Sequence, residues 1–289
     1  MAEKDITSKT LEAFNDVFAD IVNGLLFHGK QVLQEQALID AQPVSMYKAD
    51  GQYHEQERDV SKYWVDQDGE HVNIRVALLG IENQSTYDQD MPLRVIGYDG
   101  GAYRAQLGQK ARYPVVTLVL YFGEKPWGRN HSLYDAIKIP DQFRPFVNDY
   151  RINLFDISRL PGEAVGYFHS DFKIIVDYFV GRRDNPEYRP KDPQKFKHVD
   201  EVLKMLSVFT GDSRFSDFIT QEGGRPVTMC EVLDRAENKG REDGIKKGKE
   251  NARLENIRNL MESLQITARE AMVLLKLPEE DWPMYESRL

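Results

Sequence analysis

Apolar residues recur at helical spacing near the start of the chain and predict an amphipathic helix over residues 7–27. The next residues, His28-Gly29-Lys30, are typical of a helix exit, because glycine readily adopts the left-handed turn that ends many helices. The apolar positions that carry the pattern are Leu11, Phe14, Val17, Phe18, Ile21, Leu25 and Leu26.

Three strand-like runs follow this helix, at residues 44–47, 58–65 and 72–82. Between the second and third runs stands Asp66-Gln67-Asp68-Gly69, and an Asp-Gly pair supplies the positive φ that a tight hairpin turn needs. The third run is the most apolar, with a continuous centre at residues 76–81, which favours a buried central strand.

A second helix is expected over residues 91–107, with Pro92 in its first turn and a break at Gly100-Gly101. Residues 113–122 form a β-branched, apolar run that predicts another strand, ended by Gly123. The pattern therefore predicts an α/β protein: a helix, a three-strand meander, a helix and a strand.

The segment that follows is harder to interpret. Residues 152–155 favour a further strand and residues 171–179 a helix. Residues 182–198 combine arginines and lysines with prolines, and two interpretations stay open for them: a solvated linker, or an arm that contacts phosphate.

A long helix rich in Glu, Lys and Arg is predicted over residues 228–264. Inside it Gly240, Gly244 and Gly248 recur every fourth residue and so share one face, where each costs about 1 kcal/mol relative to alanine. That face either admits a partner helix, as in a homo-oligomer, or marks a flexible, poorly packed segment, which the pattern slightly favours. Two short helices are expected at residues 267–275 and 279–285.

Composition is that of a folded protein, with 41% hydrophobic and 29% charged residues. The single cysteine, Cys230, rules out a disulfide within the chain and fits a reducing cytoplasm. The first residues do not resemble a secretion signal, and no apolar run approaches the length of a membrane helix, so we expect a cytoplasmic protein that does not contact a membrane. A net charge of -9 argues against a protein that coats nucleic acid, but not against a nuclease.

Two carboxylates are expected to meet at one end of the predicted hairpin. Asp59 opens the strand at 58–65 and Glu82 closes its antiparallel neighbour, so the pairing brings them close together. Glu82 and Gln84 lie two residues apart and point to one face, whereas Asn83 points away. Adjacent carboxylates repel unless a positive charge lies between them, and Mg²⁺ prefers an all-oxygen site of this kind. Solvated acids at strand ends are also common, and the spacing alone does not exclude them.

The element order and several ordered motifs resemble the PD-(D/E)XK nuclease superfamily and, more closely, its Rpn family of recombination-promoting nucleases, also described as putative transposases. The similarity extends over roughly residues 5–160. The segments that carry it are Asn15-Asp16-Val17-Phe18, Glu57-Arg58-Asp59-Val60, Leu79-Gly80-Ile81-Glu82-Asn83-Gln84, residues 91–99, residues 113–123 and Trp127.

This resemblance implies a restriction-endonuclease-like core and a Mg²⁺- or Mn²⁺-dependent DNA endonuclease. Asp59 and Glu82 would be its metal ligands, and Gln84 would stand where the superfamily has lysine. Glutamine carries no charge and cannot act as a general base, so activation of water would depend on the metal. Asp16 would match an acidic residue of the first helix that supports the metal, although an exposed surface acid is an equal interpretation.

Arg94 and Tyr98 lie four residues apart on the second helix and share a face. Arg94 could bind a DNA phosphate through paired hydrogen bonds, or form a salt bridge to a nearby acid such as Asp90. On the resemblance, the chain divides into a nuclease-like domain at 1–180, a basic linker and helix at 181–226, and a C-terminal helical region at 227–289. The competing function is a DNA-binding accessory protein on the same fold with weak or no activity.

Overall fold

A computed structural model of the protein describes residues 11–41, 44–49, 52–67, 73–212, 215 and 227–289. The chain divides into two compact units, Met1–Val232 and Leu233–Leu289. The first unit contains the predicted strands and the candidate site, and the second contains only helices among its described residues.

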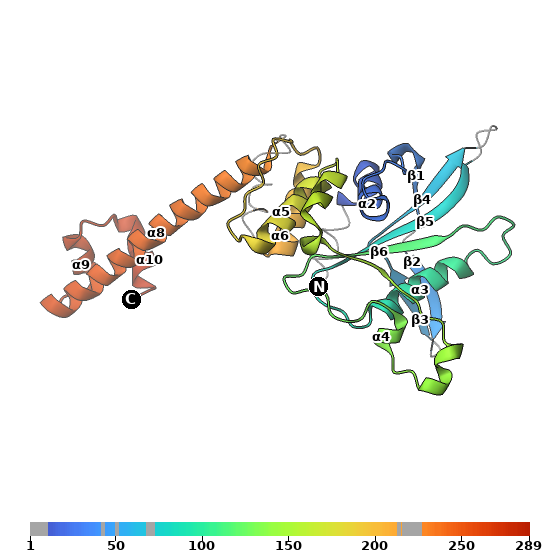
Figure 1. Ribbon diagram of the computed structural model, residues 1–289. Coiled ribbons are helices and arrows are strands. Elements are labelled where there is room, and N and C mark those ends of the chain that lie inside the picture. Colours follow the sequence, from blue (N-terminus) through green and yellow to red (C-terminus); the bar gives the residue numbers. More distant parts are fainter. Residues whose placement is uncertain (1–10, 42–43, 50–51, 68–72, 213–214, 216–226) are drawn as a thin grey trace. The chain divides into compact units, whose positions relative to one another are not determined.

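Within the described residues, a mixed sheet of five strands forms the centre of the first unit (Figure 1). Its order is β1-β4-β5-β6-β7, in which β1, β4 and β5 are antiparallel neighbours and β5, β6 and β7 are parallel. The α/β class is therefore confirmed. The strands are β1 (Leu38–Asp40), β4 (Val60–Gln67), β5 (Asn73–Gln84), β6 (Val115–Tyr121) and β7 (Asn153–Asp156).

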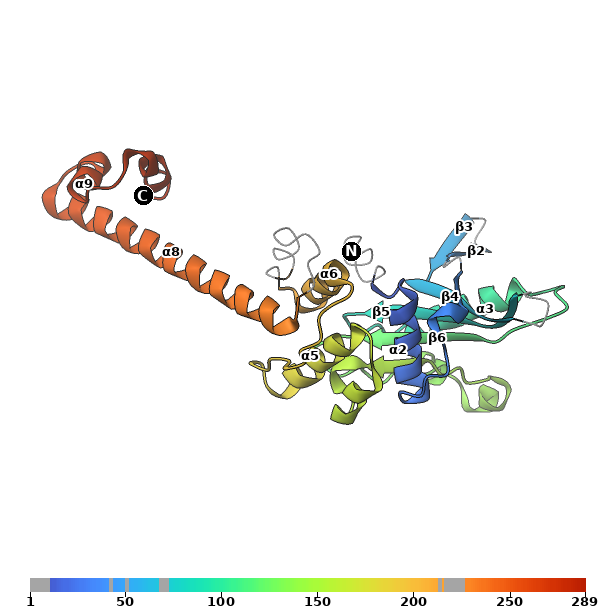
Figure 2. The ribbon, with the colours of Figure 1, turned by 90° about the horizontal axis from the view of Figure 1, so that it is seen from above.

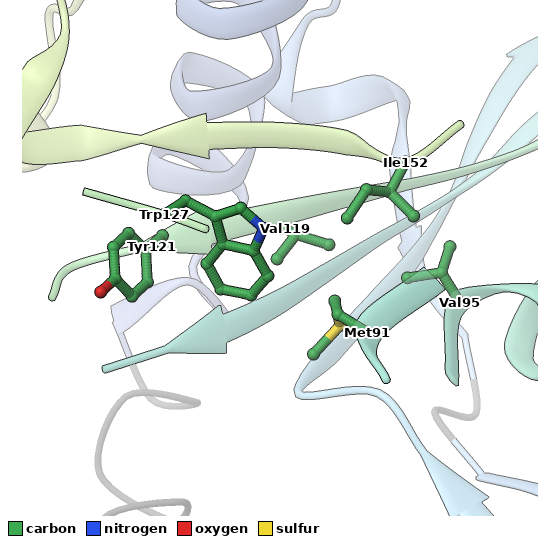
Figure 3. Packing of buried hydrophobic residues seen from close by; sticks show 6 residues of the cluster. All are labelled: Met91, Val95, Val119, Tyr121, Trp127 and Ile152. Atoms are coloured by element: carbon green, nitrogen blue, oxygen red, sulfur yellow. The ribbon is translucent and has the colours of Figure 1, made fainter. Parts of the chain in front are cut away.

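Helices cover both faces of the sheet. In the two views at right angles, α2 (Asn15–Phe27) lies on one face and α3 (Met91–Arg104) on the other (Figures 1 and 2). All but one of the β6 residues are buried, as a continuous apolar run predicts for a central strand with both faces covered. On the α3 face, alternate β6 residues join one packed cluster (Figure 3), made of Met91, Val95, Val119, Tyr121, Trp127 and Ile152.

The predicted meander exists, but its first strand was assigned to the wrong segment. Residues 44–47 are indeed extended, as part of β2 (Val44–Ala49), yet β2 pairs only with β3 (Gln52–Glu57) in a separate two-stranded sheet. The short β1 takes the place beside β4. Neither β1 nor β3 has an apolar pattern that would predict a strand. β1 is only three residues long, and β3 consists mainly of polar residues. Residues 68–72, with the predicted hairpin turn, lie outside the described residues.

The first helix begins later than its apolar pattern predicts. Of the expected range 7–27, residues 7–10 lie outside the described part of the chain, and α2 begins only at Asn15. Phe14 precedes it with an extended backbone, and its ring stacks on His198 at a centroid distance of 3.7 Å. At the other end, Gly29 has a φ of 82°, in agreement with the predicted left-handed exit.

The second helix, α3, is continuous through Gly100-Gly101, so the expected break there is wrong. The predicted strand at 152–155 is confirmed as β7, and the helix at 171–179 is confirmed but extends to Asp184 as α5 (Phe172–Asp184). Arg182 and Arg183 therefore belong to a helix, and only the part of the basic segment from Asn185 onward is irregular.

The remaining elements of the first unit are short, except for α6 (Val199–Thr210). They are α4 (Leu133–Ala136), η1 (Glu35–Ala37), η2 (Asp141–Phe146), η3 (Ile157–Arg159) and η4 (Gly162–Tyr167). In chain order, η1 lies between α2 and β1, α4 and η2 lie between β6 and β7, and η3 and η4 lie between β7 and α5.

The second unit is built on α8 (Met229–Leu264), which confirms the predicted long helix. The C-terminal half of α8 packs against α9 (Ala268–Leu274) and α10 (Trp282–Glu286), after η5 (Glu279–Asp281). Thr267 and Glu270 begin α9 with reciprocal side-chain caps, which satisfy two backbone N–H groups. The buried residues of this unit's cluster are Leu254, Ile257, Ala271, Met272 and Tyr285.

Candidate metal centre

The pairing of β4 with β5 brings Asp59 and Glu82 to the same end of the sheet. Val60 lies opposite Ile81, so the residue before Val60 faces the residue after Ile81. Oδ2 of Asp59 accepts a hydrogen bond of 2.7 Å from the backbone N–H of Asn83, which fixes this carboxylate against the end of β5. The expected proximity of Asp59 and Glu82 follows directly from the antiparallel register.

Side chains alternate along the end of β5 as predicted. Gln84 and Glu82 share a face, and Nε2 of Gln84 donates to Oε1 of Glu82 at 3.2 Å. Asn83 points away from them, and its Nδ2 donates to Oε2 of Glu12 at 2.7 Å. Glu82 is almost completely buried, with an exposed fraction of 2%. A buried carboxylate is costly unless opposite charge or hydrogen bonds compensate for it.

Arg94 of α3 provides that compensation. Its Nη2 donates to Oε1 of Glu82 and, at 3.1 Å, to the hydroxyl of Tyr98, and its Nη1 donates to Asp88 at 3.0 Å. Burial has the largest single effect and acts to lower the pKa of Arg94, but Glu82, Tyr98 and Asp88 together outweigh it and raise that pKa. Arg94 and Tyr98 therefore do share a face, and the acids that Arg94 bridges are Glu82 and Asp88, not Asp90.

The hydroxyl of Tyr98 also contacts Glu82, at 3.5 Å from Oε1. Burial and, next, the charge of Glu82 raise the pKa of Tyr98, so the phenol stays protonated at neutral pH. Tyr98 is thus a neutral hydrogen-bond donor at this carboxylate, and Arg94 is a charged one.

Glu12 completes the cluster, and the sequence analysis missed it. Its side chain is fully buried, and its Oε1 has no hydrogen-bond partner among the described residues. Burial raises the pKa of Glu12 well above the usual value, and the charges of Asp59 and Glu82 raise it further, against the opposing hydrogen bond from Asn83. The negative charges of Asp59 and Glu82 thus disfavour the ionised form of Glu12.

Asp16 lies in different surroundings from those that the resemblance implied for it. Its Oδ2 accepts a hydrogen bond of 2.6 Å from Nζ of Lys197, and Nε2 of His198 is 3.2 Å from both of its oxygens. Burial acts to raise the pKa of Asp16, but the bonds from Lys197 and His198 outweigh it and lower that pKa. The acid that the structure brings to Asp59 and Glu82 is Glu12, four residues earlier.

A buried network holds the strand end that carries Asp59. Nη2 of Arg58 donates to Asp99 of α3 at 2.7 Å, and its Nε donates to Oγ1 of Thr117 at 3.1 Å. The guanidinium reaches these partners by crossing Gly80, where a Cβ would lie only 2.5 Å from Cδ of Arg58. The residue before Asp59 is thereby anchored across β5 to both β6 and α3.

The donor set suits a hard divalent cation. Among the described residues, no group of three or more His, Cys, Asp or Glu side chains is placed to hold a metal ion. Mg²⁺ does not need such a group, because it is usually bound through one or two carboxylates and keeps several waters. The unpartnered Oε1 of Glu12, and the repulsion that Glu12 experiences from Asp59 and Glu82, are what a positive charge at this point would relieve.

Tyr121 and Trp127 pack in the core. Their rings meet edge to face at a centroid distance of 4.9 Å, and both are buried (Figure 3). No helix in the described residues is both long and apolar enough to span a bilayer.

Part of the chain matches a known protein family. Residues 60–177 match a family model described as putative transposase, YhgA-like. The match includes Glu82, Gln84, Arg94 and Tyr98, and begins one residue after Asp59. No curated protein and no solved structure matches the chain. The expected resemblance to the Rpn family is thus confirmed over residues 60–177, which match the model of YhgA-like putative transposases, the Rpn/YhgA family of the PD-(D/E)XK superfamily.

Proposed function

We propose that the protein is a Mg²⁺- or Mn²⁺-dependent DNA endonuclease that hydrolyses phosphodiester bonds. The observation that carries the proposal is the placement of Glu12, Asp59 and Glu82 at one end of the β4–β5 pair, where burial and then the charges of Asp59 and Glu82 raise the pKa of Glu12. The family is described as transposase-like, which supports DNA as the polymer on which such a site acts.

We assign this function to residues 1–180, as a restriction-endonuclease-like core. The order of a helix, three antiparallel strands, a helix and a parallel strand supports the assignment. In this division of the chain, residues 181–226 connect the proposed nuclease domain to the helical region at 227–289.

In this proposal Asp59 and Glu82 hold the cation, and Glu12 supports it with the free oxygen of its carboxylate. When bound, a divalent cation stabilises the negative charge that develops on phosphorus and lowers the pKa of a water that it contacts. Gln84 is hydrogen-bonded to Glu82, so its amide keeps the carboxylate oriented and can direct a water or a phosphate oxygen.

Arg94 has a second role in the proposal. It now neutralises Glu82, yet its side chain remains 39% exposed, so part of the guanidinium is open to solvent. A cation held by Glu82 would take over that neutralising charge. Arg94, still positioned by Asp88 and Tyr98, would then be placed to bind a phosphate oxygen of DNA.

Plasmid cleavage with Mg²⁺ tests the proposal. Glu82→Gln and Asp59→Asn keep the size of each side chain but remove its charge, and we expect each to slow cleavage more than about 100-fold, because losing even an outer-shell partner of a metal ligand costs about 10–100-fold. Asp177→Asn is the matched control, since Asp177 lies on α5, accepts a hydrogen bond from Tyr188 and touches none of the proposed ligands. Cleavage at the wild-type rate by both Glu82→Gln and Asp59→Asn would sink the assignment.

A DNA-binding accessory protein on the same fold is the second candidate. It is favoured by Gln84 in place of lysine and by Arg94, which already supplies a positive charge to Glu82. Titration calorimetry with Mn²⁺ discriminates between the two functions. No heat of Mn²⁺ binding from a chain that still retards DNA in a gel would favour the accessory protein.

A further inference from the structure

A cavity lies beside the proposed centre, within the first unit. Its volume is about 470 Å³, which is within the range of about 300–1,000 Å³ that small-molecule sites occupy. It is formed by the end of β6, by α5 and by the C-terminal end of α6. We call it the Phe122 pocket. The lining residues that matter here are Phe122, Phe179, Phe209, Arg159, Arg182 and Arg183.

Aromatic rings form the apolar wall of the Phe122 pocket. Phe122 is almost completely buried and holds the other two: it stacks on Phe209 at a centroid distance of 4.1 Å and meets Phe179 edge to face at 5.4 Å. Phe179 and Phe209 are only half-buried. They therefore present part of their ring surface to the cavity, where a flat, apolar group of a ligand can pack.

Of the three arginines, two are already engaged. Arg159 donates to the backbone oxygen of Glu124 at 2.6 Å and to Asp156 at 3.3 Å, and Arg183 is paired with Asp184 at 2.7 Å.

Arg182 is the cation that remains. It lies over the ring of Tyr178 at 5.3 Å and forms no ion pair within the described part of the chain. The lining also includes the acids Glu124 and Asp212, so the pocket is not a general anion site. It combines one available guanidinium with aromatic walls.

The Phe122 pocket directly adjoins the strand that carries the proposed centre. The backbone N–H of Phe122 donates to the oxygen of Gln84 at 2.8 Å, and the side chain of Gln84 is bonded to Glu82. Neighbouring strands lie about 4.8 Å apart. The pocket thus lies at the same end of the sheet as Glu82 and one strand away, on the face that α5 and α6 cover, whereas Glu82 faces α3.

We propose that the Phe122 pocket holds one unpaired nucleotide of the DNA substrate. Its base packs against Phe179 and Phe209, and its phosphate pairs with Arg182. Every base has a flat π-face, so stacking of this kind accepts any sequence. The proposal rests on the proposed function, because it takes DNA as the substrate. It adds that the enzyme prefers DNA with unpaired nucleotides next to the cleaved bond.

Binding without metal tests the pocket separately from cleavage. Fluorescence anisotropy of a fluorescein-labelled oligothymidylate, measured in EDTA with the full chain, reports binding that needs no cation. We expect Phe209→Leu to weaken binding about tenfold, since removing one stacking partner has an effect of this order. We expect a loss of about the same size for Arg182→Gln, which removes a charge-assisted hydrogen bond to phosphate. The matched control is Arg144→Gln, because Arg144 also lies over a tyrosine ring, that of Tyr134 at 4.6 Å, but outside the pocket.

A blunt duplex serves as the second probe, and circular dichroism checks that each variant is folded. We expect Arg182→Gln and Phe209→Leu to bind the duplex as the wild type does, since it offers no unpaired base. Equal weakening for both probes would overturn the proposal and leave a plain phosphate contact. Unchanged oligothymidylate binding by both variants, or none by the wild type, would also overturn it. Cleavage that still depends on Glu82 would then leave the metal centre standing.

Discussion

At the scale of single residues, the structure changes which acid near the start of α2 lies beside Asp59 and Glu82: it is Glu12 and not Asp16. The apolar pattern predicted a helix through residue 12, and the resemblance implied that Asp16 on this helix supports the metal, whereas Glu12 was not considered. In the structure Glu12 is buried against Asn83, whereas Asp16 pairs with Lys197 and His198. Asp59, Glu82 and Gln84 were predictable because a hairpin register fixes them. Glu12 was not, because its place depends on a contact with a residue 71 positions away.

Paired substitutions at these two acids give the first prediction. We expect Glu12→Gln to slow Mg²⁺-dependent plasmid cleavage by at least about tenfold, the lower limit for residues that support a metal ligand. Asp16→Asn should leave the rate unchanged, since its partners are Lys197 and His198 and not the proposed ligands. The reverse pattern, with Asp16→Asn impaired and Glu12→Gln normal, would show that the helix acid and not Glu12 serves the centre.

The ion pair of Asp16 gives a prediction about pH. The pKa of Asp16 is lowered in the folded protein, so its ionised form stabilises the fold above the ordinary pKa of 3.8 and this stabilisation is lost as pH falls through the lowered pKa. Asp16→Asn should therefore unfold at lower urea concentration than the wild type at pH 7, and the difference should shrink as the pH is brought below 3.8. A difference of equal size at both pH values would mean that the charge of Asp16 contributes nothing.

At the scale of elements, the strands with strong apolar runs were predictable and the weak ones were not. β5 and β6 lie at the centre of the sheet with both faces covered, so burial alone selects their sequences. β1 and β3 are strands because they pair with a neighbouring strand, and a local sequence pattern does not predict such pairing. The contacts of α3 explain why two adjacent glycines do not break it, since its apolar face is held against β6.

The side chain of Arg58 crosses β5 over Gly80, so we expect alanine to change the stability of the fold differently at Gly80 and at Gly100. Gly80→Ala would place a Cβ 2.5 Å from Arg58 Cδ, so we expect a loss of about 1–3 kcal/mol in the free energy of unfolding. Gly100→Ala on α3 would meet nothing within 4 Å among the described residues and should gain about 0.5–1 kcal/mol through helix propensity. Urea denaturation measures both. Similar stabilities for the two variants would contradict the anchoring role of Arg58.

At the scale of the whole molecule, the chain combines a mixed-sheet unit with a helical unit. A methyl group added at Gly244 or Gly248 of α8 would meet nothing within 4 Å among the described residues. The predicted glycine face is thus present, and the other described helices of this unit do not cover it. A homo-oligomer through the C-terminal helices would cover this face. The other interpretation, which the sequence pattern slightly favours, is a poorly packed segment with no partner helix.

The double variant Gly244→Ala/Gly248→Ala tests that face. Alanine is the better helix former by about 1 kcal/mol at each position, so we expect greater helicity by circular dichroism and an unchanged mass by sedimentation equilibrium. A wild-type oligomer that dissociates in the double variant would contradict this expectation and identify the glycine face as an interface between copies.

The central claim is that Asp59 and Glu82 hold a divalent cation, with Glu12 in support. A crystal of the full chain soaked in Mn²⁺ tests it most directly, because anomalous scattering locates the metal independently of activity. We predict an anomalous peak within bonding distance of carboxylate oxygens of Asp59 and Glu82, at about 2.0–2.2 Å as for other small divalent ions, with Arg94 withdrawn from Glu82. An occupied Mn²⁺ site elsewhere on the chain, with the Arg94–Glu82 pair intact, would contradict the account.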